Sequence, residues 1–392
     1  MTMSKKLTLI ALGLFAASTL LIAPRPSQAA ATFATVSTLA GTTQQQGTTD
    51  GIGAAARFYV PEDLALSADG TFALVSDTGN GTIRKIDLAT AQVATIAGTP
   101  GQFDQVDGIG LAARFFDPSG ITLSQDGSVA LIADACTVRK LVVATGAVTT
   151  IAGRWPSGSN GGSCTTSDGV GDAARFSNVW DVALSADGKI AVTSDVSHVI
   201  RKIDMATGQV TTLAGLANQP GGTDGVGASA RFFSPQGVAL TPDGTTVLVA
   251  DTTNQAIRKI DLATGQVTTL AGVADPLMGA CLDGTGAAAR FSGPSGLAMT
   301  NDGRTALVVE YACERVRMID VASGKVTTLA GLLTNLPGTD GPGPVAGFDF
   351  PFGIAVSPDG RLALVADTTS DTIRRIDISR LPYSVNLPFM LQ

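Results

Sequence analysis

Six near-copies of one segment fill the sequence, spaced 55 to 62 residues apart. A repeat of this length indicates an array of supersecondary units, none of which can bury its apolar face without a neighbour. The repeat therefore constrains the fold far more than the activity. The landmark of each copy is an apolar string such as VTTLAG, which begins at Val36, Val93, Val148, Val210, Val267 and Val326.

Each copy contains four strand candidates. In the copy that begins at Thr223 they read GVAL, TVLVAD, AIRKID and VTTLAG, with D-G, D-T-T-N and A-T-G-Q turns between them. Four consecutive antiparallel strands form a meander, and such sheets repeated around an axis form a β-propeller. A solenoid of parallel rungs is the alternative, but its rungs would be shorter. We therefore predict an all-β, six-bladed β-propeller of four-stranded antiparallel blades.

The order of the strands predicts how the ring closes. The first VSTLAG string, at Val36, precedes every other strand candidate, and no such string follows the last I-R-R-I-D strand at Ile373. We predict that the segment Val36 to Gly41 completes the sixth blade, because closure removes two exposed sheet edges. The C-terminal tail, residues 379–392, is the alternative source of that strand.

The N-terminus resembles a secretory signal. Lys5 and Lys6 precede an apolar run, and Ser27 and Ala29 supply small residues for cleavage after Ala29. An uncleaved anchor is the alternative, although the run is short for a membrane span. We expect a signal peptide over residues 1–29, a short segment over 30–35, one propeller over 36–378 and a tail over 379–392. This organisation predicts a secreted or periplasmic protein.

Charge narrows the classes of partner. The net charge is −7 and the sequence contains no basic run, so nucleic acid and anionic membrane surfaces are not expected partners. The 44% hydrophobic content is enough for a large core. We expect a monomer.

Charged and aromatic residues recur at fixed places in every copy. We interpret the D-G-x-G element as a turn, in preference to a Ca²⁺ site, because one acid in each loop provides too few ligands. The second strand ends in an acid and the third strand carries an arginine, which predicts one ion pair in each blade. The Phe of A-R-F is expected to fill the seam between blades. No cofactor is expected.

Over residues 36–378 the sequence resembles the repeat of NHL proteins. The resemblance rests on three successive motifs in each copy: P-x-G-(V/I/L)-A, V-A-D and I-R-K-I-D. The preceding D-G-x-G-x-x-A-R-F element is similar to that of long-period members. The tripeptide that names the family is poorly kept, since Ser197-His198-Val199 occupies its place. The resemblance implies a six-bladed propeller. Propellers of the NHL family include protein- and RNA-binding modules, extracellular sensor domains and an amidating lyase.

Departures from the repeat are the best functional signal. Four copies begin the first strand with P-x-G, whereas the first copy has Pro-Glu-Asp and the third has Val-Trp-Asp. These positions border one mouth of the channel in a propeller. Aromatic rings beside acids suit a sugar, a peptide or a cation, and the alternative is that the rings fill blade seams. The candidate ligand-binding residues are Glu62, Asp63, Trp180, Asp181, Gln236 and Phe352.

The evidence for catalysis is weaker. Glu62 and Asp181 permit a comparison with metal-dependent lactonases of the SMP-30/gluconolactonase type, but no matching Asn is evident. The single histidine, His198, lies where an NHL repeat places its own and is expected to be a turn residue rather than a catalytic base. One histidine also disfavours a His-rich zinc centre. No catalytic residue and no metal ligand is assigned.

Two of the four cysteines lie in the longest loops, and the other two lie in turns. Cys164 and Cys281 stand in loops of 14 and 10 residues, where the other four have 8, and Cys136 and Cys313 stand in turns expected on the same face. Of the three possible pairings we predict Cys136–Cys164 and Cys281–Cys313, which an exported protein permits.

Together these features predict a non-catalytic binding scaffold for a protein or glycan ligand. A metal-dependent hydrolase, lactonase or lyase with its site at the channel mouth is the alternative.

Overall fold

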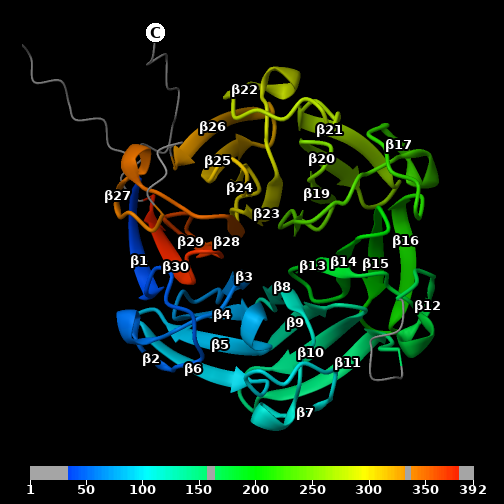
Figure 1. Cartoon of the computed structure of the whole chain (residues 1–392). Coiled ribbons are helices and arrows are strands. Elements are labelled where there is room, and N and C mark those ends of the chain that lie inside the picture. Colours follow the sequence, from blue (N-terminus) through cyan, green and yellow to red (C-terminus); the bar gives the residue numbers. More distant parts are fainter. Residues whose placement is uncertain (1–33, 157–163, 332–336, 379–392) are drawn as a thin grey trace, which may run out of the picture. The chain divides into compact units, whose positions relative to one another are not determined.

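Six antiparallel sheets arranged in a ring form the structure, a computed structural model that describes residues 34–156, 164–331 and 337–378 (Figure 1). All described residues belong to one compact unit. The predicted signal peptide and the C-terminal tail lie outside them. The ring confirms the predicted six-bladed, all-β propeller.

Within each blade the first three strands run from the centre outwards in sequence order. The innermost strands are β3 (Pro61–Leu66), β8 (Pro118–Leu123), β13 (Val179–Leu184), β18 (Val238–Leu240), β23 (Pro294–Met299) and β28 (Pro351–Val356). The second strands are β4 (Phe72–Asp77), β9 (Val129–Asp134), β14 (Ile190–Asp195), β19 (Thr246–Asp251), β24 (Thr305–Glu310) and β29 (Leu362–Asp367).

The third and fourth strands complete the predicted meander. The third strands are β5 (Thr82–Asp87), β10 (Thr137–Val142), β15 (Val199–Asp204), β20 (Ala256–Asp261), β25 (Arg315–Asp320) and β30 (Thr372–Asp377). The fourth strands are β6 (Gln92–Ala97), β11 (Ala147–Gly153), β16 (Gln209–Gly215), β21 (Gln266–Gly272), β26 (Lys325–Ala330) and, in the sixth blade, β1 (Thr35–Gly41).

Each blade has one strand more than predicted. The D-G-x-G element forms a two-residue strand that pairs with the outer edge of the fourth strand, and a short 3-10 helix follows it. These strands are β2 (Gly51–Ile52), β7 (Gly108–Ile109), β12 (Gly169–Val170), β17 (Gly225–Val226), β22 (Gly284–Thr285) and β27 (Gly341–Pro342). The helices are η1 (Gly53–Ala55), η3 (Gly110–Ala112), η4 (Gly171–Ala173), η5 (Gly227–Ser229), η6 (Gly286–Ala288) and η7 (Gly343–Val345), while η2 (Thr78–Asn80) lies in the turn between β4 and β5.

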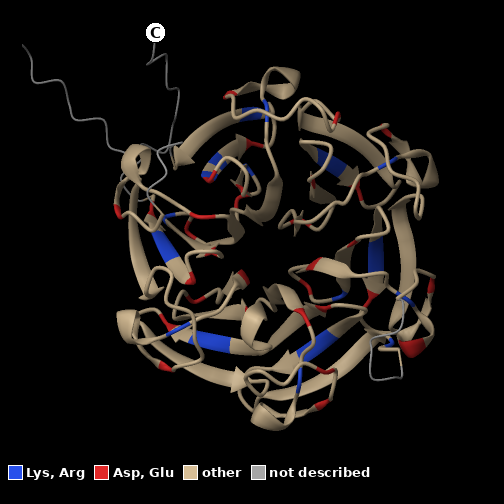
Figure 2. Ribbon diagram, viewed as in Figure 1, with Lys and Arg blue, Asp and Glu red and all other residues tan. Residues whose placement is uncertain are grey.

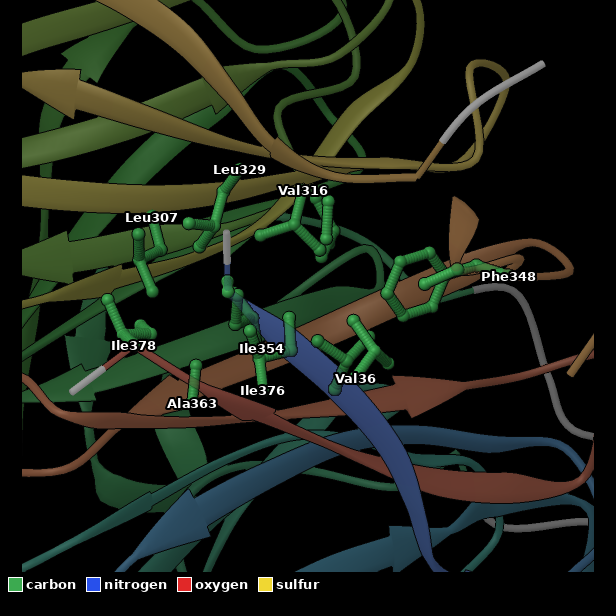
Figure 3. Packing of buried hydrophobic residues seen from close by; sticks show 14 of the residues in the cluster. Val36, Leu307, Val316, Leu329, Phe348, Ile354, Ala363, Ile376 and Ile378 are labelled. Carbon is green, nitrogen blue, oxygen red and sulfur yellow. The ribbon is translucent and has the colours of Figure 1, made fainter. Parts of the chain in front are cut away.

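The N-terminal strand closes the ring, as predicted. β1 pairs antiparallel with β30, from Thr35 opposite Asp377 to Gly41 opposite Thr372. Val36 is buried between the fifth and sixth blades, close to Phe348 and Ile376 (Figure 3). The last blade therefore consists of strands from both ends of the propeller.

The core consists of seams between neighbouring blades rather than one central cluster. Each seam combines apolar side chains of two adjacent sheets, and the Phe of A-R-F or its counterpart Phe348 is fully buried in it. The prediction that these rings fill the seams is confirmed. Packing of this kind makes each blade depend on its neighbours.

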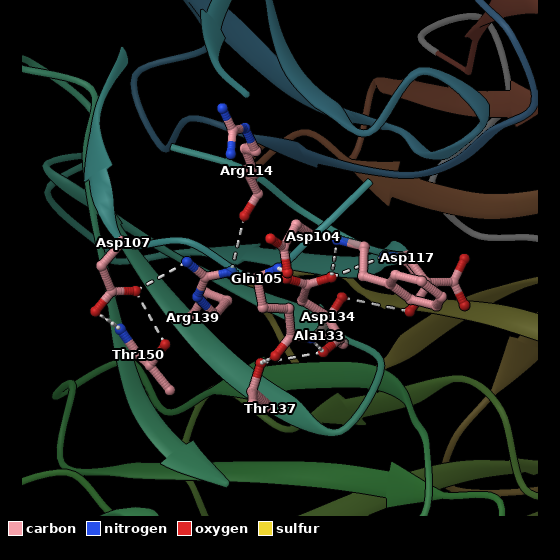
Figure 4. Close-up of polar contacts among 12 residues, drawn as sticks. Asp104, Gln105, Asp107, Arg114, Asp117, Ala133, Asp134, Thr137, Arg139 and Thr150 are labelled. Atoms are coloured by element: carbon pink, nitrogen blue, oxygen red, sulfur yellow. Dashed lines mark hydrogen bonds and ion pairs between the residues drawn. The ribbon is translucent and has the colours of Figure 1, made fainter. Parts of the chain in front are cut away.

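An arginine on the third strand forms the polar centre of every blade. In the second blade, the Arg139 guanidinium donates to Asp134 at 2.7 Å and to Asp107 at 2.8 Å, and it lies 5.3 Å from the centroid of the Phe115 ring (Figure 4). Figure 2 shows that basic positions recur in the third strands around the ring. Equivalent arginines are Arg84, Arg201, Arg258, Arg317 and Arg374.

This cluster confirms the predicted ion pair and corrects the role of the D-G-x-G acid. We expected that acid to cap its own turn. Instead Asp107 accepts hydrogen bonds from Arg139 and from both the amide and hydroxyl of Thr150 on β11. The carboxylate therefore ties the outer edge of the blade to its buried centre, and it is not available as a calcium ligand while these bonds hold.

Both predicted disulfides are present. Cys136–Cys164 joins the β9–β10 turn to the loop before β12, with the two Cα atoms 5.9 Å apart. Cys281–Cys313 joins the loop before β22 to the β24–β25 turn, with the two Cα atoms 6.2 Å apart. Each long loop is thus fixed to a turn at the same end of the strands. None of the helices in the described part of the chain has the length and apolarity that a membrane span requires.

Candidate functional site

The inner strands approach one another so closely around the channel that most copies need glycine where they meet. A Cβ atom added to Gly120 would lie 2.4 Å from the Cα atom of Asp181, and one added to Gly353 would lie 2.5 Å from that of Asp63. Asp63 and Asp181 themselves occupy the glycine position of their own blades. These two blades therefore place carboxylates where the other blades have no side chain.

A pocket opens at this end of the inner strands, with about 510 Å³ of empty space including the part open to solvent. The structure brings all six candidate residues to this pocket, although they come from four different blades. They are Glu62 and Asp63 on β3, Trp180 and Asp181 on β13, Gln236 two residues before β18, and Phe352 on β28. Their role in binding remains a prediction.

Backbone amides of the next blade fix the two aspartates. Asp63 Oδ2 accepts a hydrogen bond of 2.9 Å from the Ile121 amide, and Asp181 Oδ2 accepts one of 2.8 Å from the Val238 amide. Burial raises the pKa of Asp181 to about 7. Burial and then the Asp181 carboxylate raise the pKa of Asp63 well above its usual value. The pair thus resists carrying two negative charges when the pocket holds no cation.

Glu62 is the least compensated of the acids. Burial, with a smaller effect of the Asp117 carboxylate, raises the pKa of Glu62 to about 8. Its Oε2 atom is shielded from solvent and has no hydrogen-bond partner among the described residues. The carboxyl group is therefore mostly protonated at neutral pH and available for a ligand.

An aromatic wall stands beside the acids. The Trp180 and Phe352 ring centroids are 6.0 Å apart, and Tyr311 stacks on Phe352 at 6.4 Å and on Phe350 at 5.0 Å. Sequence reasoning missed Tyr311. The signal was present, because the fifth copy alone has an aromatic residue directly after the acid that ends its second strand.

Two further polar atoms of the pocket lack partners. Trp180 Nε1 and Gln236 Oε1 are shielded from solvent and make no hydrogen bond with the described residues. A buried polar atom without a partner costs about 1–3 kcal/mol. One donor and two acceptors, counting Glu62 Oε2, are therefore left for a ligand or for water.

The raised pKa of Glu62 predicts a pH-dependent stability. Between its usual value of 4.5 and about 8 the native state holds a proton that the unfolded chain has released, so Glu62 makes stability fall as pH rises across this window. In urea denaturation at pH 8, Glu62→Gln should raise the free energy of unfolding above that of the wild type by about 1–3 kcal/mol. This gain should shrink towards pH 5. Asp172→Asn, at an exposed acid on η4, is the matched control. A gain independent of pH would contradict the assignment.

The other sequence candidates lie outside the pocket. His198 is a turn residue with φ of +71°, as predicted, and its Nδ1 accepts a hydrogen bond of 3.1 Å from the Ser234 amide. In the described part of the chain, no three His, Cys, Asp or Glu side chains are grouped as metal ligands. The carboxylates of the pocket do not by themselves make a metal centre.

Comparisons with known proteins agree with this architecture. No protein-family model matches the chain. It is 28% identical over 332 residues to Protein SUPPRESSOR OF QUENCHING 1, chloroplastic, of Arabidopsis thaliana, covering 82% of this chain and 30% of that protein. It is 24% identical over 343 residues to NHL repeat-containing protein 2 of Bos taurus, covering 80% and 46%. The chain thus spans less than half the length of these relatives.

Among solved structures, the fold is similar to an auxiliary nutrient binding protein from Bacteroides thetaiotaomicron, with a TM-score of 0.66 and 14% identity. The match covers 88% of this chain and 76% of the other. At this identity the likeness shows the fold alone. The relatives named for NHL repeats and the six-bladed ring together confirm the resemblance stated from the sequence.

Proposed function

We propose that this NHL-repeat six-bladed β-propeller is a non-catalytic binding scaffold that works outside the cytoplasm and takes an end group of a protein or glycan ligand into its channel-mouth pocket. The observation that carries the proposal is the convergence of the six non-repeated residues. The recurring charges are used within the blades, where each arginine binds two acids. Only residues that depart from the repeat leave polar atoms free in a pocket.

The surroundings of the pocket support a ligand larger than the pocket itself. Tyr59, Phe116 and Phe350 stand one or two residues before inner strands, at the same end as the pocket, and each is 40–47% exposed. Exposed rings offer contact area to a peptide or a glycan. The two disulfides fix loops at this end and favour an oxidising compartment. The fold is also that of a protein named for nutrient binding.

The metal-dependent enzyme is not proposed. Glu62 and Asp181 supply two carboxylates, but the described residues group no third His, Cys, Asp or Glu with them as a metal site needs. No catalytic step is therefore derived through a metal. Stoichiometric metal in the purified protein, lost together with a hydrolytic activity, would reverse this choice.

Screening on peptide and glycan arrays tests the binding proposal. Glu62→Ala/Trp180→Ala/Asp181→Ala should lose at least about tenfold in affinity for hits of the wild type, since these side chains provide the free polar atoms and one wall. Leu111→Ala/Asp172→Ala, at exposed outer positions, is the matched control and should keep the hits. Thermal melting confirms that each variant is folded. Hits that survive the triple variant, or the absence of any hit, would overturn the proposal.

A further inference from the structure

The channel-mouth pocket gathers carboxyl groups without a positive partner. Glu62, Asp63 and Asp181 line it, while its lining contains no Lys, Arg or His side chain. Five of the six blade arginines hydrogen-bond two acids, and Arg201 hydrogen-bonds Asp168 and lies 4.0 Å from Asp195. A cation that enters the pocket would therefore meet carboxyl groups that have no other cationic partner and that ionise beside it.

The free polar atoms define the kind of cation. Glu62 Oε2 and Gln236 Oε1 can accept hydrogen bonds from a ligand, and Trp180 Nε1 is a donor that needs an acceptor. A quaternary ammonium has no N–H and would leave both acceptors unsatisfied. A neutral polyol would satisfy the acceptors but would not offset the charge of the carboxylates.

From this arrangement we propose that the pocket binds a primary ammonium group, R–NH₃⁺, whose carrier has a hydrogen-bond acceptor next to the nitrogen. The inference rests on the proposed binding function and names the chemistry that it recognises. The ammonium donates to Glu62 and Gln236, and the neighbouring acceptor receives the Trp180 N–H. The faces of Trp180 and Phe352 provide the cation–π wall that a compact, hydrated metal ion uses poorly.

Binding is coupled to proton release. The titratable groups around Glu62 are all acidic: Asp63 on β3, Asp117 before β8 and Asp181 on β13. The pocket-lining residues of β8, β23 and β28, and of the segment before β18, are not titratable. Because burial raises the pKa of Glu62, the ammonium displaces its proton to solvent and leaves a carboxylate–ammonium pair. Affinity therefore rises with pH, up to about tenfold for each unit, until Glu62 is ionised.

Calorimetric titration of the full chain with three small probes tests the inference. Ethanolamine carries the ammonium and the acceptor, ethylene glycol lacks the charge, and choline lacks the N–H groups. We expect ethanolamine to bind at least about tenfold more tightly than either control. In buffers of different ionisation enthalpy at pH 6.5, its binding should release about one proton. Glu62→Gln should lower the proton release and flatten the pH dependence of the affinity, while Asp172→Asn keeps both; no change in Glu62→Gln would contradict the assigned contact.

The outcomes distinguish a failure of the ammonium inference from a failure of the proposed binding function. Ethylene glycol or choline binding as tightly as ethanolamine would overturn the ammonium inference while leaving the binding function intact. Ca²⁺ or Mg²⁺ displacing ethanolamine stoichiometrically and stabilising the wild type but not Glu62→Gln would overturn it in favour of a metal. Trp180→Phe keeps the ring and removes the donor, so it should weaken ethanolamine binding but not that of methylammonium, which has no acceptor. Equal losses for both probes would contradict the assigned contact.

Discussion

Arg258→Leu is expected to lower the free energy of unfolding by about 3–5 kcal/mol. The arginine is fully buried and donates to Asp251 at 2.6 Å and to Asp224 at 2.6 Å, while its guanidinium lies 5.3 Å from the Phe232 centroid. Burial already raises the pKa of Asp251 to about 6, with Arg258 opposing the rise. Leucine would leave this carboxylate buried without its counter-charge. Urea denaturation at pH 7.5 measures the loss.

Two variants on the same strand pair test the cause. Lys259→Leu, next to Arg258 on β20 and without a place in the cluster, should change stability by less than about 1 kcal/mol. Arg258→Leu combined with Asp251→Leu should recover part of the loss, because the stranded charge is removed with its partner. Arg258→Leu costing no more than Lys259→Leu would show that the cluster does not stabilise the blade.

The ion pair inside each blade could be predicted because it depends on local register. Val249 lies opposite Arg258 across one hairpin, and Asp251 ends the same strand two residues later. The alternation of apolar and polar residues along the strands and the turn residues between them set the hairpin register, so this contact can be predicted from the sequence. The seam phenylalanines follow in the same way, since an apolar ring repeated in every copy must be buried at each interface.

The second partner of the arginine could not be predicted. Asp224 and Arg258 are 34 residues apart and meet only when the fourth strand has been placed between them. The two-residue strand Gly225–Val226 that carries this acid to the blade edge is too short for a periodic pattern. A D-G sequence by itself predicts a turn, so its longer-range role depends on the assembled blade.

The candidate site also combines residues that the sequence could predict with contacts that it could not. Departures from the repeat identified Asp63 and Asp181, because only they replace a glycine that close strands otherwise require. The influence of Asp117 on Glu62 was missed, since it acts between blades. The unpartnered state of the Trp180 and Gln236 side chains was missed as well. Whether these two side chains find hydrogen-bond partners depends on the residues that other blades place around the channel, which a repeat pattern does not specify.

Deleting residues 35–41 is expected to abolish cooperative unfolding and to convert the expected monomer into larger species. Without β1 the outer edge of β30 is unpaired. The seam between the fifth and sixth blades loses the buried Val36 side chain, and the seam between the sixth and first blades loses that of Ala40. An open array exposes β30 for pairing with another chain. Size-exclusion chromatography should show oligomers or aggregate, and the urea transition should broaden. Val36→Asp, which buries a charge at the same place, should cost about 3 kcal/mol or more.

Truncation after Ile378 separates the two segments that the sequence offers for closing the ring. Because β1 already occupies the edge of β30 from Thr35 to Gly41, removal of residues 379–392 should leave a monomer with the wild-type urea midpoint. A synthetic peptide of residues 33–42 should restore the monomer of the protein that lacks residues 35–41, because its main chain can pair again with β30. The reverse pattern, a stable β1 deletion and an unstable tail truncation, would show that the C-terminal tail closes the ring.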